Sequence, residues 1–288
     1  MDWLDALIQG MLLGGIYALF ALGLSLVFGI MRFVNLAHGD FIILAAFVVL
    51  ALSAKSGLSL AAATLVAIPV MFALGYAIQR LVFERVLCDD MMPPLLVTFG
   101  VSVVIQNGLL LIFGADSQRL QAGDLESYSL SVLPGLNIGL APLVGLVAAI
   151  GVIGLLQLLF YHTSIGRAFR ATADSPEIAQ LVGIRHRHTY AIAVGLSLAV
   201  SVIAAVALGM RANFDPSIGP ARLLYAFEAV AIGGLGNLWG TLVGGVVVGV
   251  AQTLGARINP EWQILAGHLA FLIVLIFRPR GLFAGGTA

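Results

Sequence analysis

The residue types that hydrolysis requires are present in the sequence, but their spacing gives weak support for it. Two segments have the glycine–x–serine pattern found around serine nucleophiles, Gly23-Leu24-Ser25-Leu26 and Gly195-Leu196-Ser197-Leu198. Such a serine also needs a histidine base on a neighbouring element, and the candidates are His38 and His268. The pattern arises easily by chance in a chain rich in glycine, serine and leucine. The zinc-binding pattern His-Glu-x-x-His does not occur. We therefore expect no catalytic residues and no metal ligands.

A different chemistry, weak binding of a polar solute in transit, would use isolated polar side chains in apolar surroundings. The hexapeptide Asn35-Leu36-Ala37-His38-Gly39-Asp40 lies between two very apolar stretches, and Glu228 lies within the apolar run Tyr-Ala-Phe-Glu-Ala-Val. A carboxylate in such a run is costly unless it faces a cavity, a partner or an interface. The candidates for lining or gating a solute pathway are Tyr17, Asn35, His38, Gln106, Asn107 and Glu228.

Each of these candidates also has a structural alternative. Gln106 and Asn107 could form only hydrogen bonds between helices, which contribute about 0.6 kcal/mol on average in membranes. A neutral His38 could cap a broken helix as well as contact a solute. Glu228 could bind an ammonium group, or it could pair with Arg222 or with a partner protein. The sequence leaves both kinds of role open for these residues.

The composition indicates that these polar residues belong to an integral membrane protein. Of the 288 residues, 60% are hydrophobic and 10% are charged, whereas soluble domains are about 45–50% apolar and 25% charged. The formal net charge is zero, so no basic surface suggests a nucleic-acid partner. We expect one transmembrane domain over residues 1–288, surrounded by the lipid bilayer.

The apolar runs predict an all-α bundle of about eight transmembrane helices. Spanning helices need about 20 apolar residues each, and some of the runs are short or broken. The nine apolar segments are 6–30, 38–52, 58–79, 95–113, 139–160, 189–209, 223–235, 239–256 and 263–277. The two long polar stretches between them are 115–137 and 161–188.

The distribution of lysine and arginine predicts an orientation for these segments, because cytoplasmic loops carry more of both. With 161–188 inside and alternating segments, the cytoplasmic residues are Arg32, Arg80, Arg85, Arg167, Arg170, Arg185, Arg187, Arg278 and Arg280. The outer residues are Lys55, Arg119, Arg211, Arg222 and Arg257. This distribution predicts a periplasmic N-terminus, an extracytoplasmic 115–137 loop and a cytoplasmic C-terminus.

Two of the apolar segments are too short for comfortable spans, and each borders a polar or glycine-rich interruption. As helices, 38–52 and 223–235 would cover only about 20–22 Å of a hydrocarbon core about 30 Å thick. Paired interruptions of this kind indicate a transport pathway built from broken helices, although two short, tilted helices with capped ends would also fit. The glycines expected to form the breaks or the close helix contacts are Gly39, Gly233, Gly234, Gly236, Gly240 and Gly244.

The stretch 161–188 predicts a compact helix–turn–helix outside the membrane. Ser175 suits an N-cap, Pro176 the first helical position, and Gly183 a C-terminal stop. The functional interpretation is an element that docks into a groove of a soluble ATPase, and the plainer one is an amphipathic loop on anionic lipid.

Five segments of the sequence resemble the LivH-type permeases of branched-chain amino acid ABC transporters, nearly end to end and in the family's order. These segments are 23–47 (GLSLVFGIMRFVNLAHGDFIILAAF), 98–107 (TFGVSVVIQN), 166–184 (GRAFRATADSPEIAQLVGI), 215–249 and 278–283 (RPRGLF). Asp40 stands where the family motif often has glutamate, and Glu228 within an apolar segment is a second departure.

The resemblance implies a permease subunit of an ATP-driven importer in the bacterial inner membrane. Its partners would be a homologous LivM-type permease, two LivG/LivF-type ATPase subunits and a periplasmic solute-binding protein. ATP and magnesium would bind to the ATPases, because this chain lacks the Walker A pattern. The residues that would form the ATPase-coupling segment are Gly166, Arg167, Arg170, Ala171, Asp174, Ala179, Leu181, Gly183 and Ile184. The outer candidates for contact with the binding protein are Asp116, Arg119, Asp124 and Glu126.

Three alternatives to this function differ in class or in substrate. A secondary carrier or channel also uses broken helices but needs no cytoplasmic coupling helix. An enzyme is disfavoured by the weak serine pattern. Within the importer class, the solute could be a branched-chain amino acid, or instead urea, an amide or an aromatic acid, since the binding protein selects it first.

Overall fold

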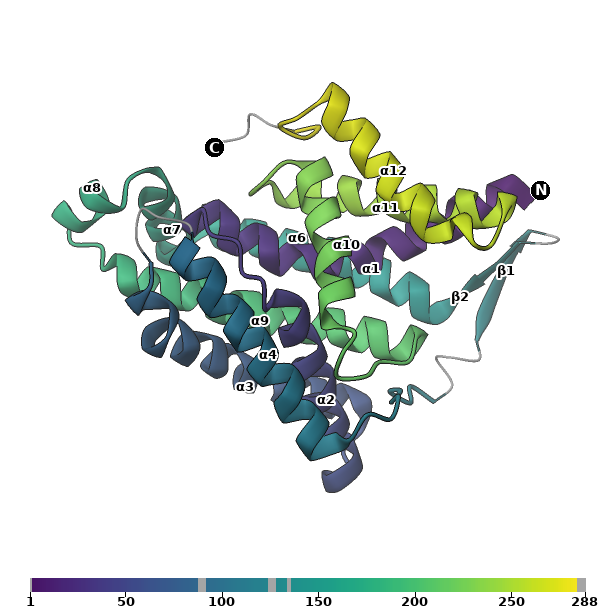
Figure 1. Cartoon of the computed structure of the whole chain (residues 1–288), viewed down its shortest axis with the longest axis horizontal. Coiled ribbons are helices and arrows are strands. Elements are labelled where there is room, and N and C mark those ends of the chain that lie inside the picture. The colour runs from purple at the N-terminus through teal and green to yellow at the C-terminus, as the bar shows by residue number, and fades with distance from the viewer. Residues whose placement is uncertain (1, 88–91, 124–127, 134–135, 284–288) are drawn as a thin grey trace.

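The computed structural model describes residues 2–87, 92–123, 128–133 and 136–283 of the 288-residue chain. Over these residues the chain forms eleven α-helices, one short 3₁₀ helix and a two-stranded hairpin (Figure 1). The elements are α1 (Asp2–Met31), α2 (His38–Ser56), α3 (Leu60–Leu81), η1 (Phe83–Arg85), α4 (Met92–Phe113), β1 (Ser129–Leu133), β2 (Leu136–Gly139), α6 (Leu140–His162), α7 (Ser164–Asp174), α8 (Pro176–Leu181), α9 (His186–Arg211), α10 (Gly219–Gly233), α11 (Leu238–Ile258) and α12 (Trp262–Phe277).

All nine apolar segments of the sequence are helices in the structure, which confirms the expected membrane bundle. Six of them, α1, α3, α4, α6, α9 and α11, are long and apolar enough to cross a membrane. Two shorter apolar helices, over 38–54 and 262–277, bring the number close to the eight expected. The remaining helix, α10, has 15 residues and therefore spans only about 22 Å.

The expected length of the second segment was wrong. The sequence predicted that it ends at residue 52, but α2 continues to Ser56, and Gly57 then ends it with a φ of 62°. The residues after position 52 include Ser53, Ala54 and Lys55, which are small or polar but compatible with a helix. The helix therefore extends beyond the apolar run. The 19 residues of α2 cover about 28 Å, close to the thickness of the hydrocarbon core.

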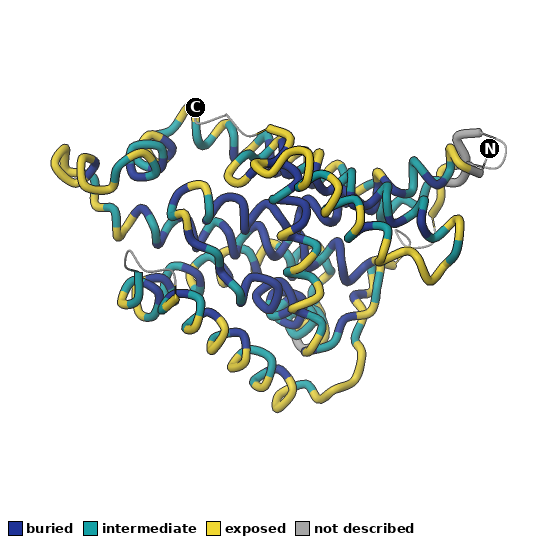
Figure 2. The backbone as a smooth tube through the Cα atoms, turned by 45° about the horizontal axis from the view of Figure 1, so that its top comes forward, coloured by how far each residue is buried: buried dark blue, intermediate teal, exposed yellow. Residues whose placement is uncertain are grey.

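The helices divide into a buried centre and an exposed rim. In the most apolar window of each helix, 89% of α1 and 72% of α9 is buried inside the protein, against 17% of α4 and 22% of α3. Figure 2 shows the exposed rim helices around this buried centre. An apolar helix that exposes most of its surface suits contact with lipid or with another membrane subunit.

Close backbone contact holds the centre together where α1 crosses α11. A Cβ atom placed on Gly14 of α1 would lie 2.7 Å from the carbonyl oxygen of Gly245 on α11. One on Gly249 would lie 2.5 Å from the Gly14 nitrogen. Glycines four residues apart on both helices therefore let the two backbones touch, as in other membrane bundles.

The stretch 115–137 contains more structure than the loop that the sequence predicted. Strands β1 and β2 pair antiparallel, with Ser129 opposite Gly139 and Leu130 opposite Ile138. In the sequence, polar and apolar residues alternate just before Pro134-Gly135, a pattern typical of a strand followed by a turn. The prediction of a loop did not take this short pattern into account. The hairpin and α8 lie at opposite ends of the long axis of the molecule (Figure 1).

Candidate functional site

The first interruption, residues 32–37, is partly buried and is capped by one of its own side chains: Phe33, Asn35 and Ala37 are buried, whereas Arg32 is exposed. Arg32 follows α1 with a φ of 51°, a left-handed conformation that is uncommon for a residue other than glycine. The Asn35 side-chain oxygen then accepts a hydrogen bond from the Ala37 backbone nitrogen at 3.0 Å. Asn35 is 3% exposed, so this bond satisfies a donor that water cannot reach.

His38 connects the start of α2 to the middle of α1. Its Nε2 lies 2.9 Å from the Phe20 carbonyl oxygen, and the residue is 1% exposed. A carbonyl only accepts hydrogen bonds, so Nε2 carries the proton in this arrangement. The ring therefore joins two helices and is closed off from solvent.

Neither serine of the glycine–x–serine segments is arranged as a nucleophile. Ser197 donates to the Gly23 carbonyl oxygen at 2.8 Å, and Ser25 accepts from Thr241 at 3.1 Å. Both hydroxyls thus join helices, and within the described part of the chain neither is hydrogen bonded to a histidine. The geometry gives no support to hydrolysis.

Asp40 and Gln106 meet between α2 and α4. Gln106 Nε2 donates to Asp40 Oδ1 at 3.0 Å and to Ser102 Oγ at 3.1 Å. The second oxygen of Asp40 is buried without a hydrogen-bond partner in the described structure. Asn107, the neighbouring candidate, is exposed and donates to the Val103 carbonyl oxygen of its own helix at 2.8 Å. The two adjacent residues therefore face different surroundings.

Tyr17 and Glu228 belong to one chain of polar and aromatic contacts across four helices. The Tyr17 hydroxyl donates to Gln252 on α11 at 2.6 Å, and its ring stacks on Tyr225 with centroids 4.9 Å apart. Tyr225 lies against His268 of α12, and His268 pairs with Glu228. Arg222 was the expected intramolecular partner of Glu228, and the structure supplies His268 instead. The local sequence does not reveal it, because the two residues are 40 positions apart.

The second interruption separates α10 from α11 and resembles the first in its capping. Gly234 and Gly236 have φ values of 103° and 84°, so the turn depends on glycine. Asn237 accepts a hydrogen bond from the Gly240 nitrogen at 2.8 Å and starts α11, much as Asn35 acts before α2. A Cβ atom on Gly29, near the end of α1, would lie 3.1 Å from Gly236. The second break therefore packs against the end of α1 that leads into the first break.

Glycines beside the second break have the packing role that the sequence predicted for them. A Cβ atom on Gly233 would overlap the Gly240 carbonyl, one on Gly240 would overlap the Gly233 carbonyl oxygen, and one on Gly244 would overlap the Ala229 carbonyl oxygen. The backbones of α10 and α11 are thus in direct contact along this part of the bundle.

The segment after α12 completes the end of α10. The Leu282 nitrogen donates to the Ile232 carbonyl oxygen at 2.8 Å, and the Phe283 nitrogen donates to that of Gly233 at 3.3 Å. These carbonyls belong to the last turn of α10, where the helix itself offers no donors. The Arg-Pro-Arg-Gly-Leu-Phe motif thus has a structural function, because it closes a helix from a distant part of the chain.

The stretch 161–188 forms the two short helices that its sequence predicts. Ser175 accepts a hydrogen bond from the Ile178 nitrogen at 3.4 Å, Pro176 begins α8, and Gly183 follows with a φ of 88°. Gly166 packs so tightly that a Cβ atom there would overlap the Phe160 carbonyl. Arg170 donates to that same carbonyl oxygen and lies over the Tyr161 ring. These contacts hold α7 firmly against α6.

The proposed coupling residues divide into anchors and an exposed tip. Gly166 and Ala179 are buried, and Arg170, Ala171 and Ile184 are half-buried, whereas Arg167, Asp174, Leu181 and Gly183 are exposed. Two apolar residues that the sequence did not single out, Ile178 and Val182, join Leu181 at the tip. These three are 63%, 72% and 86% exposed, respectively. An apolar patch on a rigid projection is suited to insertion into another protein.

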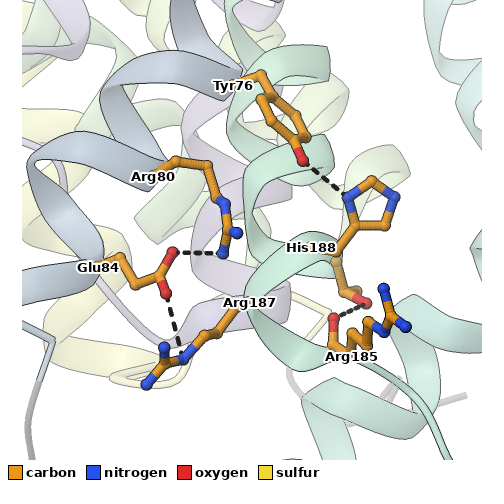
Figure 3. A network of polar contacts seen from close by, with 7 residues as sticks. Tyr76, Arg80, Glu84, Arg185, Arg187 and His188 are labelled. Atoms are coloured by element: carbon orange, nitrogen blue, oxygen red, sulfur yellow. Dashed lines mark hydrogen bonds and ion pairs between the residues drawn. The ribbon is translucent and has the colours of Figure 1, made fainter.

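A polar network joins α3 and η1 to the start of α9, the helix that follows this projection (Figure 3). Glu84 accepts from Arg80 at 2.8 Å and from Arg187 at 3.2 Å, so it joins α3 to the first turn of α9. Beside it, the Tyr76 hydroxyl lies 2.9 Å from His188 Nδ1. Sequence reasoning did not identify this network, because Tyr76 and His188 are 112 positions apart.

The remaining candidates concern metals and the outer loop. No group of three or more His, Cys, Asp or Glu side chains that could hold a metal ion occurs among the described residues. Asp124 and Glu126 lie outside the described residues. Asp116 is exposed, and Arg119 donates to the Met210 carbonyl oxygen at 3.3 Å.

Comparison with known proteins agrees with this architecture. The family model for the branched-chain amino acid transport system permease component matches residues 6–277. The permease BraD of Pseudomonas aeruginosa is 30% identical, with 97% of this chain and 95% of that protein covered. The permease LivH of Salmonella typhimurium is 28% identical over the same shares. Both of these relatives are described as high-affinity branched-chain amino acid transport system permease proteins.

A solved structure shares the fold at lower sequence identity. A chain of PsaBC from Streptococcus pneumoniae, solved with a Fab, aligns with a TM-score of 0.50 at 14% identity. The alignment covers 96% of this chain and 92% of that chain. The shared fold agrees with the family match and the curated relatives, which identify a multi-pass membrane permease, a subunit of an ABC importer and not an enzyme. The chain belongs to the branched-chain amino acid transport system permease component family.

Proposed function

We propose that this chain conducts branched-chain amino acids into the bacterial cytoplasm across the inner membrane. The observation that carries the proposal is the firmly anchored projection α7–α8 with its apolar tip of Ile178, Leu181 and Val182. A carrier or channel has no use for such a tip, whereas a permease driven by separate ATPases needs one. The substrate class follows from the similarity to BraD and LivH over nearly the whole chain.

The proposed complex contains this chain and a homologous LivM-type permease, two LivG/LivF-type ATPases and a periplasmic binding protein. ATP and magnesium bind to the ATPases in this arrangement. The tip of α8 faces the cytoplasm with the C-terminus, and the β1–β2 hairpin and the N-terminus face the periplasm. Nine of the 14 basic residues then lie on the cytoplasmic side, in agreement with the usual bias.

The proposed mechanism is alternating access driven by the ATPases. Closure of the ATPase dimer moves α8. This movement passes to α9 along the connecting chain, and from α9 it passes to α3 through the ion pairs of Glu84. Displacement of α9 and α3 then reshapes a path between the two permeases. The polar residues His38 and Gln106 keep the broken helices in register during this change, because their hydrogen bonds join separate helices, while Asn35 caps the break itself.

The coupling role is tested by placing charge on the apolar tip. Leu181→Asp together with Val182→Asp should abolish uptake of radiolabelled leucine by the complete transporter while the permease still inserts into the membrane. Leu81→Asp is the matched control, since Leu81 is also an exposed leucine at a helix end but lies outside the projection. Uptake that survives ATP depletion would contradict the importer mechanism and indicate a carrier.

The substrate class is tested separately on the binding protein that serves this permease. Leucine, isoleucine and valine should bind with micromolar or better affinity, and urea, short amides and aromatic acids should bind at least about a hundredfold more weakly. Preference for one of the latter solutes would overturn the amino acid assignment and leave the importer class unchanged.

A further inference from the structure

Two arginines from different helices share one small pocket at the end of the bundle where α9 ends and α10 begins. Arg211 is the last residue of α9, and Arg222 lies in the first turns of α10. The pocket has a volume of about 70 Å³ and is lined by Leu13, Ile16, Tyr17, Phe20, Leu208, Arg211, Ala212 and Arg222. Five apolar side chains and the Tyr17 ring thus line the pocket beside Arg211, which is exposed, and Arg222, which is half-buried.

Neither guanidinium has a carboxylate partner within the described residues. The Nε atom of Arg222 is buried and has no hydrogen-bond partner there. Buried polar groups are nearly always satisfied in native proteins, and two like charges in one pocket repel each other. The α10 N-terminus adds further positive potential beside Arg222. The arrangement therefore favours an anion beside the two guanidinium groups.

The size and the walls of the pocket restrict what this anion can be. On the same measure one water molecule needs about 10–15 Å³, so a volume of about 70 Å³ has room for a carboxylate. The apolar walls formed by Leu13, Ile16, Phe20 and Leu208 favour an acid group that is attached to aliphatic carbon. Arginine also matches the planar, two-oxygen geometry of a carboxylate better than lysine does.

We propose that Arg211 and Arg222 bind the carboxylate of the transported amino acid at its entrance to the permease. This inference rests on the proposed function and names the atoms that first receive the solute. Tyr17, which stacks on Tyr225, then forms an aromatic wall beside the bound carboxylate. Two residues at the ends of adjacent helices can separate when the helices move, so the solute would be released as the pathway opens inward.

The test measures thermal stabilisation of the purified chain in nanodiscs of uncharged lipid. The three probes are leucine, 4-methylpentanoate, which keeps the carboxylate but lacks the ammonium group, and leucinamide, which lacks the carboxylate. A ligand that binds the folded state raises the melting temperature. Leucine and 4-methylpentanoate should stabilise the wild type, and leucinamide should have no effect.

The variants locate this effect at the pocket. Arg211→Gln and Arg222→Gln should each weaken binding about tenfold or more, the usual loss when one hydrogen bond to a charged group is removed. The charge-preserving variant Arg211→Lys/Arg222→Lys should keep part of the stabilisation, which guards against simple misfolding of the glutamine variants. Arg257→Gln is the control, because Arg257 is an exposed arginine at the end of α11 and does not line the pocket.

Several results would overturn the inference. One is that leucinamide stabilises the wild type as much as leucine does, and another is that leucine fully stabilises the double glutamine variant. A third is that the wild type is stabilised only in nanodiscs with anionic lipid, which would indicate a lipid phosphate in the pocket. Leucine uptake by the complete transporter separates the two proposals. Normal uptake with an unchanged KM in the double glutamine variant would reject the arginine site alone, whereas no leucine uptake by the wild type would reject the proposed function.

Discussion

The buried carboxylate of Asp40 offers a test at the scale of single residues. One oxygen accepts from Gln106, and the other has no partner in the described structure. Asp40→Asn keeps an acceptor for Gln106 and removes a charge, so we expect the free energy of unfolding to stay unchanged or to rise. Gln106→Leu removes the donor and should lower it by about 1–3 kcal/mol. Denaturant unfolding in detergent measures both changes.

Ser102 supplies a control for that experiment. Ser102→Ala removes a second contact of Gln106 and a hydroxyl beside Asp40 but leaves the bond between Gln106 and Asp40 in place, so its cost should be smaller than that of Gln106→Leu. If Asp40→Asn proved strongly destabilising, the unpartnered oxygen of Asp40 would have to be satisfied by a group outside this chain.

The pair of Glu228 and His268 gives a second prediction at this scale. Glu228 is buried, and the His268 side chain is 32% exposed, so His268→Leu would leave a carboxylate without its partner. We expect a loss of about 3 kcal/mol, the lower end for a broken buried pair. Adding Glu228→Gln to His268→Leu should recover much of that loss. An additive double-mutant cycle would show that the two side chains do not interact.

Sequence reasoning identified the unusual polar residues more reliably than their partners. Asn35 caps a backbone donor two positions away, a local relation that the sequence exposes. Glu228 stands out because a carboxylate is costly in an apolar segment, yet its partner His268 comes from another helix. Arg211 was counted only as an outer charge, and Arg222 as an outer charge and a possible partner of Glu228, since nothing local indicates that two helix ends bring them to one pocket.

At the scale of helices, contact between backbones makes some glycines irreplaceable. A Cβ atom on Gly39 would overlap the Gly219 carbonyl oxygen and lie 2.8 Å from the Leu223 nitrogen. Since backbone cannot move aside as a side chain can, Gly39→Ala should cost about 1–3 kcal/mol. It should also separate the start of α2 from α10.

Gly108→Ala is the matched control, because nothing lies within 4 Å of a Cβ atom at that position. Alanine is the better helix former by about 1 kcal/mol, so this variant should be neutral or slightly more stable. Thermal unfolding of both proteins in the same detergent compares them directly. Equal melting temperatures would contradict the close contact of α2 with α10.

The helices themselves were predictable, because a long apolar segment in a membrane must satisfy its own backbone hydrogen bonds and an α-helix does so within one segment. Ser175, Pro176 and Gly183 likewise fixed α8 from local capping preferences. The sequence did not predict the extension of α2 to Ser56, where helix continues without apolar residues. It also missed the β1–β2 hairpin, whose strand pattern is too short to stand out beside the long apolar runs.

At the scale of the whole molecule, motion at α8 has to reach the distant bundle, and Glu84 joins α3 to α9 on that route. Ion pairs of partly exposed groups contribute about 0.2–1 kcal/mol each. Glu84→Gln should therefore leave stability nearly unchanged but lower leucine uptake by up to about fivefold, with ATP hydrolysis by the complex continuing.

Glu261→Gln serves as the control for that variant, since Glu261 is an exposed acid just before α12, away from the network in Figure 3. The measurement is the ratio of leucine imported to ATP hydrolysed in proteoliposomes. If this ratio were the same in Glu84→Gln and in the wild type, the coupling would pass only along the chain from α8 into α9.

The closure of α10 by Leu282 and Phe283 has a consequence for biosynthesis. These residues leave the ribosome after α11 and α12, so α10 enters the membrane with two carbonyl groups that lack partners. Each such group costs several kcal/mol in hydrocarbon, and this cost persists until translation reaches the end of the motif. A chain that stops before Leu282 is therefore left with an incompletely bonded end of α10, so late truncations should destabilise a helix that is made much earlier.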